Sequence, residues 1–263
     1  MKPYHGVLVA LMALYASCAT AAQLVQVDAV AANTRAKPLL GYLAKPDGAG
    51  PFPAMVVLHG CNGFSPAMPT MVDRLRSWGY VALAIDSLGP HGQNNACSGG
   101  IALRSQPLDA YAGLTYLAAQ PFVDPKRIGV LGFSMGGVSA LTAAENGGIE
   151  NIFPRKFRVV IAYYPYCEVA RTMSVPTLVL IGALDDWTPA QACQKLAERA
   201  ASDGAPIELV IYPNAYHGFD LAILRPGLRY FGHWVEYDEA AATDSLTQTR
   251  RFLDAHLLAP EKQ

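Results

Sequence analysis

The stretch RIGVLGFSMGG, residues 127–137, places a serine between glycines at the end of an apolar run. The branched apolar residues before Gly132 predict a buried strand, and the small residues after Gly136 predict a helix. A G-x-S-x-G pattern in this context forms a sharp turn that exposes its serine above a sheet. The stretch therefore indicates either a nucleophile, Ser134, or a tight strand-to-helix turn with an incidental hydroxyl.

Strand-like and helical segments alternate along the rest of the chain. Apolar runs predict strands at 39–46, 53–60, 80–87, 127–134, 157–165, 176–186 and 207–213. Helical spacing is found at 71–79, 108–120, 136–146, 189–204 and 243–257. This alternation predicts an α/β fold with a mostly parallel sheet of about seven to eight strands and helices on both faces. The long irregular stretches 88–107 and 218–242 follow strand ends, where ligands bind in such sheets.

The overall composition is that of a globular protein. The chain has 263 residues, of which 52% are hydrophobic and 16% charged, and its net charge is −1. This balance excludes a disordered chain and gives no reason to expect a nucleic-acid or anionic-membrane partner. We expect one domain over residues 23–263, with no membrane span in the mature chain and an oligomeric state that the sequence leaves open.

The first residues resemble a targeting segment. Residues 1–22 contain a lone lysine, a short apolar stretch and the small residues Ala19-Thr20-Ala21, a pattern typical of a secretory signal peptide. An uncleaved anchor and a lipoprotein cysteine at Cys18 are the alternatives. Export, to the periplasm or the medium, would leave four cysteines, an even number that predicts two disulfides. Sequence alone permits three pairings, and four reduced core thiols are the other interpretation.

An acid and a base should follow the serine in chain order. Asp185 and Asp186 end the strand at 176–186, where side chains alternate faces, so one of them is favoured. We choose Asp185 on its spacing from Gly182, with Asp186 as neighbouring support. The alternative is that both aspartates cap the next helix. His217 follows the last strand and is the expected general base. His59 and His91 precede Ser134, against the required order.

The oxyanion of a tetrahedral intermediate needs backbone donors. Met135 N–H, at a helix N-terminus, is one candidate. The Cys61 N–H in the loop LHGCNGF is the other, although this loop also reads as a glycine-rich turn. Aromatic residues near strand ends could line a pocket but more often pack in a core: Tyr163, Tyr164, Tyr166 and Trp187.

The chain resembles the dienelactone hydrolase family of the α/β-hydrolase superfamily. The segments that carry the resemblance are PFPAMVVLHGCNGF, RLRSWGYVALAIDS, QPLDAYAGLTYLAAQPFVDPKRIGVLGFSMGG, PTLVLIGALDD and YPNAYHGFD, within residues 40–255. The resemblance implies a triad of Ser134, Asp185 and His217, with oxyanion donors at Cys61 and Met135. It also favours the disulfides Cys61–Cys97 and Cys167–Cys193, and it implies no cofactor and no metal.

The sequence departs from the family pattern in three places. Ser134 stands where the enzyme that gives the family its name has a cysteine, and Gly60 stands where that enzyme has a glutamate. Related exported sequences tend to have an arginine where this chain has His91. His91 and Arg104 are possible substrate-loop residues, although a pair with Asp109 is the first expected role of Arg104. We therefore do not expect dienelactone itself as the substrate.

The sequence thus predicts an exported serine hydrolase that cleaves small-molecule carboxylic esters or lactones. A peptidase or acyltransferase on the same triad, and a secreted binding protein without turnover, are the alternatives.

Overall fold

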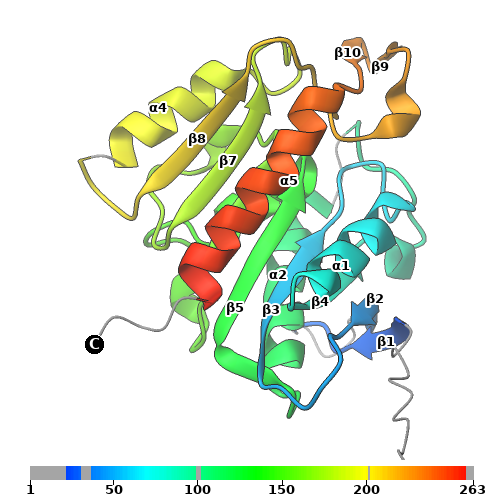
Figure 1. The fold of residues 1–263 in the computed structure, drawn as a ribbon, viewed down its shortest axis with the longest axis vertical. Coiled ribbons are helices and arrows are strands. Elements are labelled where there is room, and N and C mark those ends of the chain that lie inside the picture. Colours follow the sequence, from blue (N-terminus) through cyan, green and yellow to red (C-terminus); the bar gives the residue numbers. More distant parts are fainter. Residues whose placement is uncertain (1–21, 31–36, 99–101, 201, 259–263) are drawn as a thin grey trace, which may run out of the picture.

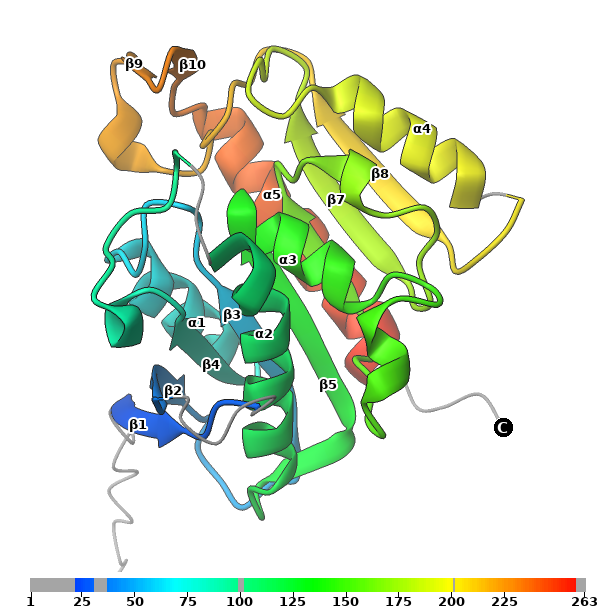
Figure 2. The same ribbon diagram turned by 180° about the vertical axis from the view of Figure 1, so that it is seen from behind.

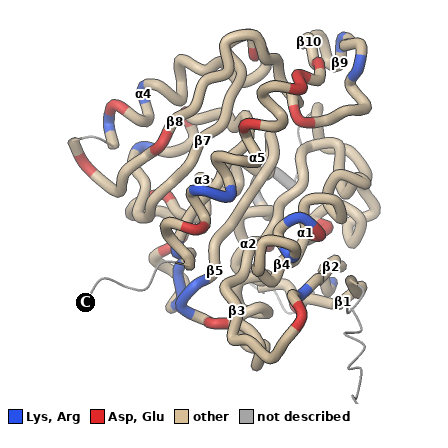
Figure 3. Tube along the Cα trace, in the orientation of Figure 1, with Lys and Arg blue, Asp and Glu red and all other residues tan. Residues whose placement is uncertain are grey.

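A computed structural model describes residues 22–30, 37–98, 102–200 and 202–258 (Figure 1). Apart from Ala22, the predicted signal peptide lies outside the described residues. Among the described helices, none is long and apolar enough to cross a membrane. In the trace of Figure 3, Lys and Arg positions are dispersed among Asp and Glu positions.

One eight-stranded sheet organises the described chain, in the order β1-β2-β4-β3-β5-β6-β7-β8. Its strands are β1 (Gln23–Val27), β2 (Leu39–Ala44), β3 (Phe52–Leu58), β4 (Val81–Asp86), β5 (Val123–Phe133), β6 (Val160–Tyr163), β7 (Thr177–Gly182) and β8 (Ile207–Tyr212). The strands from β4 to β8 in this order pair in parallel, whereas β1 and β2 form an antiparallel edge. The mostly parallel sheet confirms the predicted fold class, and β1 is a strand that the sequence analysis missed.

Helices cover both faces of the sheet. They are α1 (Ala67–Ser77), α2 (Ala102–Ala118), α3 (Met135–Ala143), α4 (Ala190–Ala200) and α5 (Glu239–Leu253). The face seen in Figure 1 carries α1 and α5, and the opposite face, seen in Figure 2, carries α2 and α3. Because both faces are covered, β3, β4 and β7 are almost wholly buried, which explains their continuous apolar sequences.

Three predicted helix starts were wrong. α1 begins at Ala67 rather than at residue 71. α2 begins at Ala102 rather than at residue 108, and it contains Pro107. α5 begins at Glu239 rather than near Thr243, because Asp238 caps it by accepting a hydrogen bond from the Ala241 N–H.

The predicted irregular stretch 218–242 contains a short hairpin, β9 (Leu228–Tyr230) and β10 (His233–Val235). The hairpin lies at the end of the sheet toward which the parallel strands point (Figure 1). Val235 also bridges to His217, so the hairpin is joined to the loop that follows β8. Residues from this far part of the sequence are thereby placed at the carboxyl edge of the sheet.

Candidate active site

Ser134 occupies a sharp turn between β5 and α3. Its backbone has φ 51° and ψ −114°, a conformation that L-residues rarely adopt and that costs about 1–3 kcal/mol. The turn is held by backbone hydrogen bonds on both sides: Ser134 N–H donates to Tyr163 O at 2.9 Å, and Val138 N–H donates to Ser134 O at 2.9 Å. The side chain is partly exposed, as a nucleophile must be.

Glycines on either side of Ser134 allow the close approach that this turn requires. A Cβ on Gly132 would lie 2.0 Å from Gly136 O, and a Cβ on Gly136 would lie 2.3 Å from Leu58 O. Real Cβ atoms do not make contacts this short with backbone. The two glycines are therefore required for β5 and α3 to pack against each other and against β3.

The structure brings Ser134, His217 and Asp185 together from the ends of three strands. His217 Nε2 lies 2.9 Å from Ser134 Oγ, and His217 Nδ1 lies 2.8 Å from Asp185 Oδ2. Asp185 and His217 are both buried. In the neutral imidazole, Nδ1–H donates to the carboxylate, so Nε2 is left to accept the serine proton.

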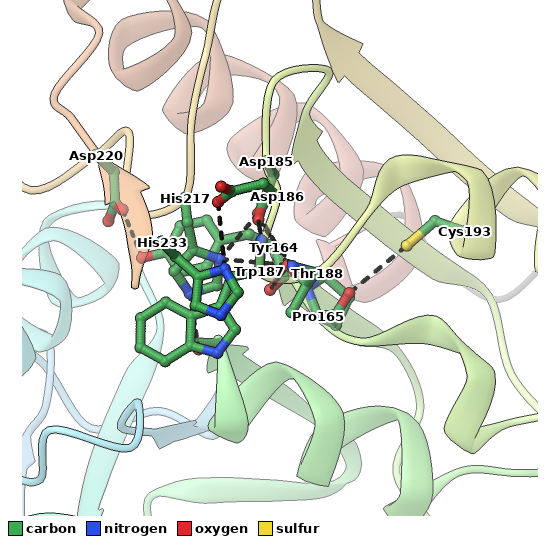
Figure 4. Close-up of polar contacts among 11 residues, drawn as sticks. Tyr164, Pro165, Asp185, Asp186, Trp187, Thr188, Cys193, His217, Asp220 and His233 are labelled. Atoms are coloured by element: carbon green, nitrogen blue, oxygen red, sulfur yellow. Dashed lines mark hydrogen bonds and ion pairs between the residues drawn. The ribbon is translucent and has the colours of Figure 1, made fainter. Parts of the chain in front are cut away.

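The Asp185 carboxylate is held by the residues that follow it. Asp185 Oδ1 accepts from the N–H groups of Trp187, at 3.0 Å, and Thr188, at 2.8 Å. Thr188 Oγ1 lies 2.8 Å from Asp185 Oδ2 and 3.1 Å from Tyr164 O, and it has one proton to donate to either (Figure 4). The Asp185 carboxylate thus accepts hydrogen bonds from backbone N–H groups, as a helix cap does, and it also binds His217. The sequence analysis missed Thr188.

The two residues with predicted oxyanion N–H groups contact each other's surroundings through one small buried apolar cluster. The side chains of Met135 and Cys61 pack with Leu88 and Ala96. Cys61 O also accepts from the Ala96 N–H at 2.7 Å. Met135 opens α3 directly after Ser134, so its N–H lies at a helix N-terminus.

A buried polar network supports the loop that carries Cys61. His59 Nδ1–H donates to Gly60 O at 2.7 Å, and His59 Nε2 accepts from the Ser87 N–H at 3.1 Å. Gln106 donates to His59 O and accepts from the Ser139 hydroxyl. Burial lowers the pKa of His59, so its neutral form is favoured in this network.

Two disulfides join the four described cysteines. Cys61 is bonded to Cys97 and Cys167 to Cys193, the pairing that the family resemblance favoured. The first disulfide links the loop after β3 to the loop after β4. With its sulfur in this disulfide, Cys61 has no free thiol that could act as a nucleophile.

A second acid, Asp220, lies partly buried behind the histidine. Tyr164 has φ 39°, its ring centroid lies 4.6 Å from that of His217, and its hydroxyl donates to Asp220 Oδ1 at 2.6 Å (Figure 4). Burial raises the pKa of Asp220 to about 6, and the Tyr164 hydrogen bond and the nearby His217 partly offset that rise. The sequence motif YHGFD gave no signal that its aspartate would bind Tyr164.

The other singled-out residues lie in different environments. Asp186 Oδ1 is 3.4 Å from His233 Nδ1, and among the described residues its side chain accepts no hydrogen bond from an N–H of α4. His91 is exposed at the end of a short 3-10 helix, Gly89–His91, and its side chain makes no hydrogen bond with a described residue. Arg104 falls in the first turn of α2, and the structure describes its backbone but not its side chain.

Two of the remaining aromatic residues are separate from the triad. Tyr163 is buried and hydrogen-bonded to Thr249, as a core residue would be, and Tyr166 is exposed beside Glu168. Among the described residues, no cluster of His, Cys, Asp and Glu could hold a metal ion.

A family model for the dienelactone hydrolase family matches residues 39–257, which is most of the chain. The chain belongs to the dienelactone hydrolase family. It is accordingly a carboxylic ester hydrolase by class. This dienelactone hydrolase family member keeps the α/β-hydrolase sheet and bears Ser134 on the turn after β5.

Individual relatives of this family member are distant. A Bradyrhizobium sp protein named "Probable 2-oxo-3-(5-oxofuran-2-ylidene)propanoate lactonase" is 28% identical over 221 residues, 76% of this chain and 86% of the relative. A dienelactone-hydrolase-like promiscuous phosphotriesterase from metagenomic libraries has a TM-score of 0.73 at 21% identity, covering 90% of this chain and 99% of that one. Esterase 2 of Thermogutta terrifontis, phosphoramylated by tabun, has a TM-score of 0.70 at 20% identity, covering 92% and 98%. At these identities the solved structures show the shared fold.

Proposed function

We propose that this chain is an exported serine hydrolase that cleaves carboxylic esters or lactones through an acyl-enzyme intermediate. The observation that carries the proposal is the hydrogen-bonded series from Ser134 Oγ through both ring nitrogens of His217 to Asp185 Oδ2, at 2.9 and 2.8 Å. A nucleophile, a base and an orienting acid in this arrangement form the constellation that acyl transfer requires.

In the first half-reaction, His217 Nε2 takes the Ser134 hydroxyl proton as Oγ attacks the ester carbonyl carbon. The carbonyl π electrons move to its oxygen, which accepts hydrogen bonds from the N–H groups of Cys61 and Met135. Asp185 stabilises the imidazolium formed. The intermediate collapses when the bond to the leaving oxygen breaks and His217 gives its proton to that oxygen.

In the second half-reaction, water attacks the acyl-serine while His217 Nε2 takes a proton from it. The second tetrahedral intermediate expels Ser134 Oγ, which regains its proton from His217. The products are the carboxylic acid and the regenerated enzyme; a lactone would yield a hydroxy acid. The name of the Bradyrhizobium relative and the ester hydrolase class of the family support these substrates.

The proposed location rests on the cysteines and the N-terminal sequence. Two disulfides persist best in an oxidising compartment, and residues 1–22 have the pattern of a cleaved signal. We expect a mature protein that begins near residue 23 in the periplasm or the medium. Fractionation followed by mass measurement of the purified chain tests this, and a full-length chain in the cytoplasm contradicts it.

The mechanism is tested with p-nitrophenyl acetate and three mature proteins: wild type, Ser134→Ala and Ser77→Ala. Ser77 is an exposed serine on α1, so its variant is the matched control. We expect Ser134→Ala to lose about 10⁴-fold in kcat and the control to lose nothing. A fluorophosphonate should label wild type and the control but not Ser134→Ala.

Ester turnover and fluorophosphonate labelling together also distinguish the proposed esterase from the alternative functions. Labelling of Ser134 without ester turnover would favour a peptidase or an acyltransferase. No turnover and no labelling would favour a binding protein that has kept the fold.

A further inference from the structure

The ring of Trp187 lies close to two imidazole rings, one of which belongs to the proposed base His217. Its ring centroid is 5.0 Å from that of His217 and 4.9 Å from that of His233, with which it is stacked at an interplanar angle of 10° (Figure 4). The sequence analysis left two roles open for Trp187, pocket lining and core packing, and favoured core packing. Trp187 is instead partly exposed, on the turn that carries Asp185.

The β9–β10 hairpin extends this surface with two more aromatic rings. The rings of Tyr230 and Phe231 lie 5.9 and 6.3 Å from that of Trp187. Together with His233, these residues form what we call the aromatic wall: Trp187, Tyr230, Phe231 and His233. Phe231, at the hairpin tip, has φ 51° and is 52% exposed.

Polar contacts fix the aromatic wall in place from two sides. His233 Nδ1 lies 3.4 Å from Asp186 Oδ1, and the Tyr230 hydroxyl accepts from Asn95 Nδ2 at 3.0 Å. Asn95 Oδ1 in turn accepts from the N–H of Cys97, one end of the disulfide that reaches Cys61. Rings held by such contacts lose little conformational freedom when a ligand packs on them.

The position of the aromatic wall relative to His217 determines which part of a substrate would meet it. The leaving oxygen takes its proton from His217 Nε2, so it must lie within hydrogen-bond distance of that ring. The oxyanion, in contrast, would face Cys61 and Met135, which pack with Leu88 and Ala96. The group attached to the leaving oxygen is therefore the part of the ester closest to Trp187.

We infer that the aromatic wall is a leaving-group subsite that binds an aromatic ring, so that the preferred substrates are esters of aromatic alcohols. This inference rests on the proposed function and names its substrate class. Stacked and edge-to-face contacts with a planar ring exceed what area burial alone gives an aliphatic group. The partly exposed wall beside the serine would be covered by such a ring.

The test compares two acetates that share the acyl group: phenyl acetate and the acetate of a fluorinated aliphatic alcohol whose acidity matches that of phenol. Matched acidity makes the intrinsic reactivity of the two leaving groups similar. We expect wild type to favour phenyl acetate about tenfold in kcat/KM, and Trp187→Leu and Phe231→Leu each to lower that ratio about threefold or more. Tyr166→Leu, an exposed tyrosine outside the aromatic wall, is the control and should keep the wild-type ratio.

The ratio of the two kcat/KM values cancels any general damage to His217, which would slow both esters alike. Equal rates for the two acetates in wild type, or a ratio that neither wall variant changes, would overturn the inference and leave the proposed function standing. Hydrolysis of neither acetate would overturn the proposed function first, and the inference with it.

Discussion

Asp185 and Asp186 are adjacent in the sequence, yet their carboxylates bind different histidines. Asp185 Oδ2 lies 2.8 Å from His217 Nδ1, whereas Asp186 Oδ1 lies 3.4 Å from His233 Nδ1. The first pair is buried, and the side chains of the second are one-third to one-half exposed. Because water screens the second pair, the two aspartates should differ greatly in what they contribute to activity.

We expect Asp185→Asn to lower kcat by about 10⁴-fold, because an amide can turn its NH₂ toward Nδ1 and so favour the wrong tautomer of His217. Asp186→Asn, as its matched control, should change kcat by less than about threefold. Steady-state hydrolysis of an aliphatic acetate, whose alcohol has no ring for the aromatic wall to bind, measures both. Equal losses in the two variants would contradict the assignment of Asp185.

The glycines of the serine turn give a second prediction. Gly136→Ala places a Cβ 2.3 Å from Leu58 O, and we expect it to lower the free energy of unfolding by about 1–3 kcal/mol through overpacking. Gly137→Ala, one residue further along α3, meets its nearest atom, Tyr163 O, at 3.1 Å and should cost less. Urea denaturation of the two variants compares them, and the reverse order would show that β3 moves away easily.

The acid behind His217 predicts a pH dependence of stability. Burial raises the pKa of Asp220 to about 6 in the folded state, above its unfolded value, so the folded state holds the proton more tightly. The contribution of Asp220 to stability is therefore present at acid pH and lost as the pH rises through about 6.

We expect wild type to lose about 1 kcal/mol relative to Asp220→Asn between pH 5 and pH 7.5. Urea denaturation at the two pH values measures the difference, in which the other titrating groups cancel. A difference that stays constant between the two pH values would show that the folded state does not raise the pKa of Asp220.

The two disulfides should differ in what their removal does to activity. Cys61–Cys97 and Cys167–Cys193 span 36 and 26 residues, so replacing either pair by alanine should cost a similar 2–4 kcal/mol of stability. Only the first holds the loop that carries the proposed Cys61 N–H donor. We expect its removal to lower kcat at least about tenfold more than removal of the second. Equal kcat values in the two folded double variants would exclude a role for this disulfide in the oxyanion site.

The sequence by itself determined the elements around Ser134 and the fold class. The apolar run at 127–131, the glycines beside Ser134 and the small residues after it act within a few positions of one another. Local patterns of this kind specify strand, turn and helix because the physical cause, steric fit and periodic burial, lies in neighbouring residues. The same is true of the strand ends that precede Asp185 and His217.

Tertiary structure decided the surroundings of these residues. The start of α2 before Pro107, the placement of the hairpin that carries His233, and the Tyr164–Asp220 hydrogen bond could not be predicted from neighbouring residues. Each depends on a segment that is distant in sequence: Gln106 on α2 bonds to the loop after β3, and Asp220 meets a tyrosine 56 positions earlier. Such contacts depend on how segments pack across the sheet, and the separation of two residues in the sequence does not give their distance in space. Only the folded structure therefore shows that the aromatic wall lies beside His217.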